Sequence, residues 1–317
     1  MAVTPSKAIQ SAPAGDRVGA RTAIVRGALR RQETTLGWLL LSPVIVVMAV
    51  LVVWPFMTAV WIAFTDKSIG REATWIGLTN FSQVLSSPRF VRALQNSLIF
   101  TVAAMAGKFV LGMAMALVLN RAFFGRNALR AFFLVPWVLP GFVAYLLWRW
   151  MLDPLQGFVN YALIDLGLVR FPVEFLSSPT WALPSVILAH IWRSFPFFGL
   201  AFLAGLQNIP AEQYEAAAVD GAGPLQQFRF ITLPGLRHVI LVVMMLSTIW
   251  TFNAFEPVYL LTGGGPSDAT MVYTVLAYEM GIVNMRLGEA SAVPVLILPV
   301  LGMFIVAVSG LMSRDDS

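Results

Sequence analysis

The chain has 317 residues, of which 58% are hydrophobic and only 12% are charged, and its mean hydropathy is +0.77. Soluble globular chains carry about 25% charged residues, so this composition excludes an ordinary soluble domain. The sequence has no cysteine and only two histidines, His190 and His238, which excludes disulfides and thiol chemistry and argues against a metal site. The net charge of +5 comes from basic residues scattered between apolar stretches, which favours a membrane topology over nucleic-acid binding.

The first segment, residues 1–35, is polar, rich in small residues and free of apolar stretches. Its basic residues are Lys7, Arg17, Arg21, Arg26, Arg30 and Arg31. This composition predicts a flexible cytoplasmic tail. The apolar run that follows is too long for a signal-peptide core and lacks a small-x-small cleavage pattern, so it predicts a retained membrane anchor.

Six segments are long and apolar enough to cross a bilayer, which takes about 20 residues of helix. They span residues 36–64, 97–119, 128–151, 181–206, 239–261 and 290–312. Their apolar residues run continuously rather than alternating, which predicts α-helices and argues against a transmembrane β-barrel. The expected fold class is therefore an all-α membrane protein, a bundle of six transmembrane helices over residues 36–312 with a short cytoplasmic end at residues 313–317.

The distribution of basic residues predicts the orientation of these spans. On the same side as the basic tail fall Arg121, Arg126, Arg130, Arg229, Arg237 and Arg314. Because loops rich in arginine and lysine stay in the cytoplasm, both termini are expected there. The loop over residues 65–93 is then external.

The loop between the fourth and fifth spans, residues 207–235, predicts two short cytoplasmic helices rather than a linker. Pro210 suits the start of a helix, and residues 211–219 are strong helix formers. Gly221 is expected to end this first helix. A second helix should then run from Pro224 through Phe230.

Pro234 marks the expected end of that second helix, because a proline inside a helix removes a backbone hydrogen bond. The residues at the corner between the two helices read Glu215-Ala216-Ala217-Ala218-Val219-Asp220-Gly221-Ala222. Small alanines let a helix seat closely in a groove, and the carboxylates can pair with basic groups at its rim. A helix lying on anionic lipid would instead carry lysine and arginine.

This string, in a loop of this length before the second-last span, resembles the EAA signature of permeases of binding-protein-dependent ABC importers. The resemblance implies that the loop docks into a cytoplasmic ATPase subunit and transmits its nucleotide-driven closure. The positions it implies for ATPase coupling are Glu215, Ala216, Ala217, Asp220, Gly221 and Ala222.

A second string, Tyr259-Leu260-Leu261-Thr262-Gly263-Gly264-Gly265-Pro266, followed by Thr270 and Tyr278, resembles the carbohydrate-uptake branch of that family. Within the branch it is similar to the first, maltose-permease-F-like, of two permease subunits. The resemblance implies a multi-pass protein of the bacterial inner membrane. Its implied partners are a second homologous permease, two copies of a cytoplasmic ATPase subunit, an external solute-binding protein and a sugar or polyol.

The triple glycine is not a phosphate-binding loop, because no G-x-x-x-x-G-K-[ST] sequence is present. The chain is therefore expected to be a transport subunit and not an enzyme, with no cofactor of its own. ATP and magnesium are expected on the partner ATPase subunit.

Polar groups within the spans are candidates for a solute pathway, because ionisable residues are costly in a membrane. Asn253 and Glu256 lie three apart on the fifth span, so they are expected on one helical face, offering hydrogen-bond groups to a sugar. Trp192 and Tyr259 suit stacking on the apolar face of a sugar. The alternatives are that the polar pair caps helix ends and that these aromatics only pack.

Three further ionisable residues, Lys108, His190 and Arg193, are expected to have structural roles. Lys108 could pair with Glu256 across the bundle, and Arg193 could satisfy carbonyls freed by a proline kink at Pro196. On this interpretation Lys108 does not contact solute.

Other functions remain open at this point. A secondary transporter would show inverted repeats and intramembrane ion sites, and an enzyme acting on a lipid-linked sugar would need paired carboxylates or a metal site. Neither pattern is visible in the sequence. The solute itself stays open, since a disaccharide, a longer oligosaccharide, a polyol or glycerol 3-phosphate all fit.

Overall fold

The computed structural model describes residues 37–313, so the expected tail over residues 1–35 and the end beyond residue 313 lie outside the described residues. The chain divides into two compact units, residues 1–61 and 62–317. The described part of the first unit belongs to one helical run, Gly37–Ala63, which matches the first predicted span. Within it a π-helical segment, η1 (Ala49–Val53), precedes α2 (Trp54–Ala63), where Pro55 lacks the amide that a regular helix needs.

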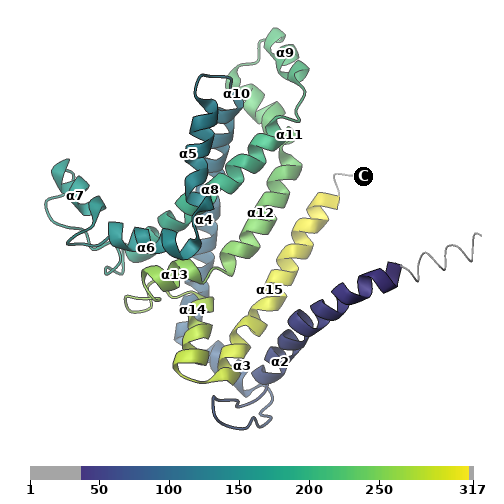
Figure 1. The fold of residues 1–317 in the computed structure, drawn as a ribbon, viewed down its shortest axis with the longest axis vertical. Helices are drawn as coiled ribbons and strands as arrows, with labels where there is room; N and C mark the ends of the chain where they lie inside the picture. Colours follow the sequence, from purple (N-terminus) through teal and green to yellow (C-terminus); the bar gives the residue numbers. More distant parts are fainter. Residues whose placement is uncertain (1–36, 314–317) are drawn as a thin grey trace, which may run out of the picture. The chain divides into compact units, whose positions relative to one another are not determined.

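The second unit is helical throughout the described residues apart from its loops and one isolated bridge between Thr65 and Trp75 (Figure 1). Its elements are α3 (Thr79–Ser86), α4 (Pro88–Asn120), α5 (Arg126–Val138), α6 (Gly141–Met151), α7 (Phe158–Asp165), α8 (Ala182–Leu206), α9 (Ala211–Val219), α10 (Pro224–Gln227), η2 (Phe228–Thr232), α11 (Leu233–Gly235), α12 (Arg237–Phe252), α13 (Glu256–Leu261), α14 (Tyr273–Tyr278), η3 (Glu279–Val283) and α15 (Leu287–Ser313).

Four helices of the described chain are long and apolar enough to cross a membrane: Gly37–Ala63, α4, α8 and α15. Two bent pairs bring the number up to six if each pair is one span, namely α5 with α6 and α10–α11 with α12. The all-α membrane class is confirmed. The third predicted span, residues 128–151, is bent, because α5 and α6 meet at 94°.

The break between α5 and α6 falls at Leu139 and Pro140. Leu139 is extended, with φ −62° and ψ 135°, as expected for a residue that a following proline keeps out of the helical conformation. Pro140 cannot donate a helical hydrogen bond. The chain therefore turns sideways here and continues as α6.

The fifth predicted span is also interrupted, because α12 ends at Phe252 and α13 begins only at Glu256, followed by Pro257. The expectation that Asn253 and Glu256 share one helical face is therefore wrong. Pro257 suits the first turn of a new helix, where its missing amide costs nothing.

The loop over residues 207–235 forms the two predicted helices. The first, α9, has the expected bounds, and Gly221 follows it with φ +80°. The second begins at Pro224 but runs past Phe230 through η2 and α11 to Gly235, so the expected end at Pro234 is wrong. The π-helical turns of η2 shift the hydrogen-bond register ahead of Pro234, which then occupies the first turn of α11.

The helices α4 and α8 pack closely along each other because small residues lie at their contact. A Cβ atom added at Gly112 would lie 2.4 Å from the Cβ of Phe198, and one at Gly199 would lie 2.3 Å from Met115 Sδ. Small residues allow such backbone approach between membrane helices, where packing replaces the hydrophobic driving force.

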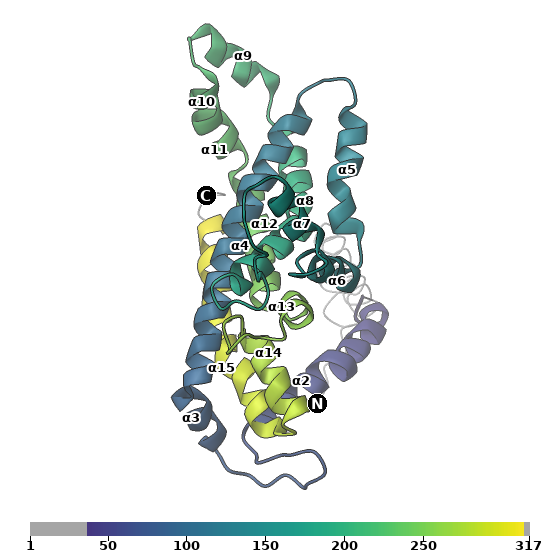
Figure 2. The same ribbon diagram turned by 90° about the vertical axis from the view of Figure 1, so that its left-hand side faces the viewer.

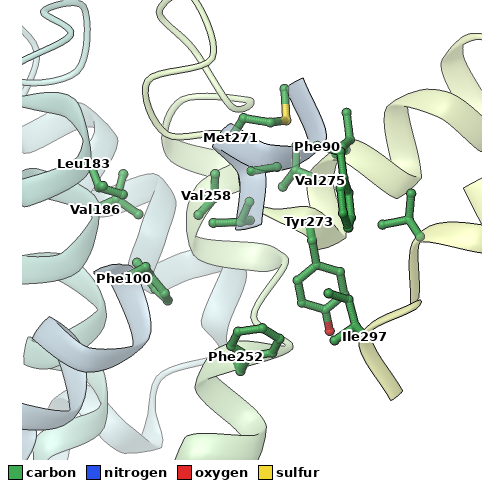
Figure 3. Packing of buried hydrophobic residues seen from close by; sticks show 14 of the residues in the cluster. Phe90, Phe100, Leu183, Val186, Phe252, Val258, Met271, Tyr273, Val275 and Ile297 are labelled. Atoms are coloured by element: carbon green, nitrogen blue, oxygen red, sulfur yellow. The ribbon is translucent and has the colours of Figure 1, made fainter. Parts of the chain in front are cut away.

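Two hydrophobic clusters hold the second unit together. One contains residues of α4, α8 and α12–α15, among them Phe100, Val186, Phe252 and Tyr273 (Figure 3). The other joins α4 and α8 to the start of α12 through Leu119, Phe202 and Leu236. Each buried cluster fixes how the long helices cross.

Several loops of the second unit lie at two opposite ends, while the connection that carries α7 lies between these ends (Figures 1 and 2). The connection between α4 and α5 lies with α9 and α10 at one end, and α3 lies with the turn between η3 and α15 at the other. Arg121, Arg126 and the two-helix loop therefore share one end of the unit, as the charge pattern predicts.

Candidate functional site

A cavity of about 300 Å³ lies among the helices of the second unit, beside both helix breaks. Its lining residues are Lys108, Trp137, Tyr145, His190, Arg193, Ser194, Phe197, Ser247, Trp250, Thr251, Ala254, Phe255, Glu256 and Pro257. Aromatic rings and hydrogen-bonding groups thus surround one space. This combination suits a solute with hydroxyl groups and an apolar face.

Lys108 is the most deeply buried charged residue of the cavity wall, with 1% of its surface exposed. Its Nζ donates to Thr251 Oγ1 at 2.6 Å and to Ser247 Oγ at 3.4 Å, one helical turn apart on α12. No carboxylate of the described residues lies within ion-pair distance of it, so the predicted pair with Glu256 is wrong. Lys108 and Glu256 instead face the same cavity.

His190 and Arg193 stand one turn apart on α8 and carry unsatisfied donors or acceptors. His190 Nδ1 lies 2.9 Å from the hydroxyl of Tyr145, and its Nε2 is buried without a hydrogen-bond partner. The Arg193 guanidinium lies 5.9 Å from the Tyr145 ring centroid and donates to the Leu139 carbonyl at 3.4 Å. That carbonyl lies at the α5–α6 break. Arg193 therefore donates to a carbonyl freed by the break at Pro140, and not to one freed at Pro196 as expected.

Glu256 begins α13 and lies directly against Gly141 at the start of α6. A Cβ atom at Gly141 would lie 2.2 Å from Glu256 Oε2. The carboxylate therefore occupies space that only glycine leaves open. The two interrupted spans meet at this contact, which places a charged group beside both breaks.

The other three expected pathway residues do not line the cavity. Asn253 Nδ2 donates to the Ile249 carbonyl at 2.7 Å, and its Oδ1 accepts a short hydrogen bond from the Tyr273 hydroxyl. Trp192 packs edge-on against Trp148 at 5.7 Å between ring centroids.

Tyr259 stacks on Phe255, with 4.8 Å between ring centroids. Phe255 is itself a lining residue, so Tyr259 contacts the wall of the cavity through this ring. Of the four residues expected to form the solute pathway, the structure thus brings only Glu256 to the cavity surface. The other three contact residues of the surrounding helices.

The six expected coupling residues lie together at the corner after α9. Glu215, Ala216, Asp220 and Gly221 are exposed, and no residue of α9 is buried. The amide of Ala222 donates to the Ala217 carbonyl at 2.8 Å, which closes the helix end across the left-handed Gly221. No residue of α9 is covered to the point of burial by other described parts of the chain.

The corner is also tied to the helix that follows it. The hydroxyls of Tyr214 and Thr232 lie 3.0 Å apart and join α9 to η2. The Gly223 amide donates to Gln226 Oε1 at 2.8 Å at the start of α10. These contacts join α9 to the helical run that leads through α11 to α12, and α12 carries Ser247 and Thr251 at the cavity.

A cluster at the opposite end of α4 was not anticipated from the sequence. The Arg89 guanidinium forms ion pairs with Asp268 and Glu279, each at 2.8 Å. Asn96 Nδ2 donates to the carbonyls of Asp268 and Met271 at 3.0 Å. The hydrogen bond from Arg89 holds the pKa of Asp268 below its ordinary value. The glycine-rich loop is thereby fixed to α4.

Sequence reasoning also missed Ser247 and Thr251 as lining residues. A signal was available for this pair, since hydroxyl residues four apart share one face of a helix. An apolar span with two such hydroxyls and a lysine on another span indicates a polar interior surface. Which spans face each other is not visible in the sequence.

Comparison with known families gives a match over residues 108–315 to the family described as "binding-protein-dependent transport system inner membrane component". A probable ABC transporter permease of Brucella suis is 34% identical over 90% of this chain and 99% of its own length. The trehalose/maltose transport system permease MalF of Thermococcus litoralis is 36% identical over 79% of this chain and 85% of its length.

A further relative is the sulfoquinovosyl glycerol transport system permease SmoG of Agrobacterium fabrum, which is 34% identical over 87% of this chain and 89% of its length. Among solved structures, a bacterial ABC transporter involved in the import of the acidic polysaccharide alginate has a similar chain. That chain gives a TM-score of 0.80 at 25% identity, covering 91% of this chain and 99% of its own length.

Proposed function

We infer the function from the family: this chain belongs to the binding-protein-dependent transport system inner membrane components, and we propose that it imports a sugar or related polyol. The chain is a permease subunit of an ABC transporter and not an enzyme, since its relatives are transport subunits whose ATPase is a separate chain. The observation that carries the sugar assignment is the 36% identity to the trehalose/maltose permease.

The cavity supports this proposal by its chemistry. Sugar hydroxyls lose hydrogen bonds to water when they enter a membrane protein, so a pathway must replace them. Tyr145, Ser247 and Thr251 offer hydroxyls, while Trp137 and Trp250 offer ring faces. We propose that solute passes this cavity and meets Glu256 there. Glycerol 3-phosphate or another polar solute is the alternative cargo.

The other three expected residues, Asn253, Trp192 and Tyr259, then act on the pathway through the residues that they contact. Asn253 fixes the end of α12 through Ile249 and Tyr273. Tyr259 fixes the lining ring of Phe255 by stacking on it. Trp192 packs within the helical wall. All three residues can stabilise the shape of the cavity without contacting the solute.

The working assembly that we propose contains this chain, a second homologous permease, two copies of a cytoplasmic ATPase subunit and an external solute-binding protein. The exposed corner at Glu215, Ala216, Ala217, Asp220, Gly221 and Ala222 docks on the ATPase subunit, which binds ATP and magnesium. Its lack of buried residues leaves it free for a partner. Both termini of the chain lie in the cytoplasm, on the same side as this corner.

The test is uptake by the reconstituted importer. Proteoliposomes carrying this chain with its partner permease and ATPase subunits should accumulate a radiolabelled sugar only when ATP is inside and the binding protein is outside. Omission of this chain should abolish uptake. Accumulation driven by a proton or sodium gradient with this chain alone would instead indicate a secondary transporter and would overturn the proposal.

A further inference from the structure

We propose that the solute carries an anionic group, which Lys108 and Arg193 receive in the cavity. This inference rests on the proposed function and names the chemical class of the cargo. The class is a sugar or polyol that bears a carboxylate, sulfonate or phosphate. It follows from the balance of charges around the cavity and from the contacts that each charged group makes.

The cavity wall has more positive than negative groups. Lys108 and Arg193 are cations, Glu256 is the one carboxylate in the lining, and His190 adds an imidazole. The ion pairs of the described residues involve Arg89 and Arg286, and neither cavity cation takes part in one. Charged groups within a membrane bundle usually pair with one another or mark a substrate path.

The residues around Lys108 show where the excess positive charge of the cavity lies. Only 1% of its surface is exposed, and its partners are the hydroxyls of Thr251 and Ser247. Hydroxyl groups orient an ammonium group without neutralising its charge. Glu256 faces the same cavity but lies against Gly141 and not against Lys108. The ammonium group is therefore held in place and lacks a counter-ion among the residues that the structure describes.

Arg193 and His190 are two further polar residues of the cavity lining. Arg193 Nε and His190 Nε2 are both buried without a hydrogen-bond partner, and only 8% of His190 is exposed. A planar guanidinium suits the oxygens of a carboxylate, sulfonate or phosphate, whereas an ammonium group acts as a point charge. A solute anion in the cavity would balance the charges of Lys108 and Arg193 together, which a neutral sugar could not do.

The test compares solutes that differ in charge but little in shape. Proteoliposomes with the complete importer and its binding protein would be supplied with radiolabelled β-1,4-dimannuronate or with neutral β-1,4-mannobiose. Sulfoquinovosyl glycerol and glycerol 3-phosphate extend the comparison to sulfonate and phosphate. We expect at least one anionic solute to be taken up at least about ten-fold faster than mannobiose, because charge-assisted hydrogen bonds are the stronger ones.

Variants of Lys108 test whether the cavity causes the faster uptake of anionic solutes. Lys108→Met should lower uptake of the preferred anionic solute about ten-fold or more per assembled complex, and Lys108→Arg should retain most of it. Lys108→Gln is the matched neutral variant, because its amide can still donate to the hydroxyls of Thr251 and Ser247 but carries no charge, so it should lose uptake as Lys108→Met does. If Lys108→Met fails to assemble, Arg193→Gln takes its place in this test. If both variants fail to assemble, the comparison of solutes on the unaltered importer decides whether the cargo is anionic.

The outcomes separate this inference from the proposed function. Uptake of mannobiose equal to or faster than uptake of every anionic solute overturns the inference and leaves the sugar permease standing. Normal uptake of the preferred anionic solute in Lys108→Gln also overturns it, since the hydrogen bonds of residue 108 and not its charge would then matter. Absence of ATP-dependent uptake for every solute, neutral ones included, contradicts the proposed function itself.

Discussion

At the scale of single residues, Asn253 shows how a polar group within a span can serve the fold. Its amide group bonds to Ile249 within α12 and to Tyr273 of α14. Asn253→Ala removes both bonds, and Tyr273→Phe removes one of them. Because a net hydrogen bond contributes about 1 kcal/mol, we expect both variants to lower the melting temperature of the purified complex, with the larger shift for Asn253→Ala.

The double variant Asn253→Ala/Tyr273→Phe provides the control for this prediction. It should be no less stable than Asn253→Ala alone, because the two changes break the same bond. Uptake per assembled complex separates the two roles of the residue. A ten-fold loss of uptake without any change in melting temperature would mean that Asn253 contacts solute directly.

Asp268 gives a pH dependence with a defined sign. Its pKa in the folded protein lies below the ordinary 3.8, because Arg89 hydrogen-bonds to the carboxylate. Ionised Asp268 therefore stabilises the fold above pH 3.8, and this contribution is lost as the pH falls through the lowered pKa. We expect the melting temperature to fall less steeply in Asp268→Asn than in the unaltered protein as the pH is lowered from 6 to about 3.

All other carboxylates titrate in both proteins, so the difference between their two pH profiles isolates Asp268. Arg89→Met should give a profile at least as flat, because it removes the ion pairs with both Asp268 and Glu279. Parallel profiles for the unaltered protein and both variants would show that this contact does not stabilise the loop.

At the scale of elements, the corner after α9 depends on a left-handed residue. Gly221 has φ +80°, where other residues pay about 1–2 kcal/mol, and no atom crowds its missing side chain. Gly221→Val should therefore misplace the corner without disturbing the core. We expect the protein to insert and assemble, but ATP hydrolysis stimulated by loaded binding protein should fall several-fold.

Two further substitutions, one at Gly223 and one at Gly221 itself, serve as matched controls for Gly221→Val. Gly223 has φ −73°, an ordinary value, and only Gln226 Oε1 at 3.9 Å would meet an added Cβ, so Gly223→Ala should leave stimulated hydrolysis near its normal level. Gly221→Asn should recover most of the loss, because asparagine tolerates the left-handed conformation. Equal stimulation in Gly221→Val and Gly223→Ala would remove the corner from the coupling path.

At the scale of the whole molecule, the opposite ends of the second unit give a test of orientation. The chain has no native cysteine, so single cysteines can be labelled with a membrane-impermeant thiol reagent. Ser68→Cys lies in the loop before α3 and Gln226→Cys lies in α10, at the two ends of the unit (Figure 2). In intact cells we expect labelling at residue 68 only, because the arginine-rich end belongs in the cytoplasm.

Permeabilised cells supply the control, since both positions should then react. Ser267→Cys, next to the Arg89 contact, should behave like Ser68→Cys. Labelling of Gln226→Cys from outside intact cells would invert the topology and place the proposed docking corner away from any cytoplasmic ATPase.

The sequence by itself determined the features that depend on neighbouring residues. Span length and continuous hydrophobicity predict the helical membrane class, and helix-forming residues with Gly221 predict the bounds and the corner of α9. Such features are local, because they follow from backbone preferences and from the apolar bilayer. The coupling motif is also local, since its six residues lie within one stretch of eight, and it can therefore be read directly from the order of the amino acids.

Only the tertiary structure decided where distant residues meet. Lys108 contacts Thr251, and Arg89 contacts Asp268, across more than a hundred residues of chain. The breaks at Pro140 and at residues 253–255 turn two expected spans aside and bring Glu256 against Gly141. Packing of α4 against α8 and the buried clusters fixes these meetings. Hydrophobic periodicity says that a face is buried but not against which partner, so the cavity and its charge balance emerge only from the assembled helices.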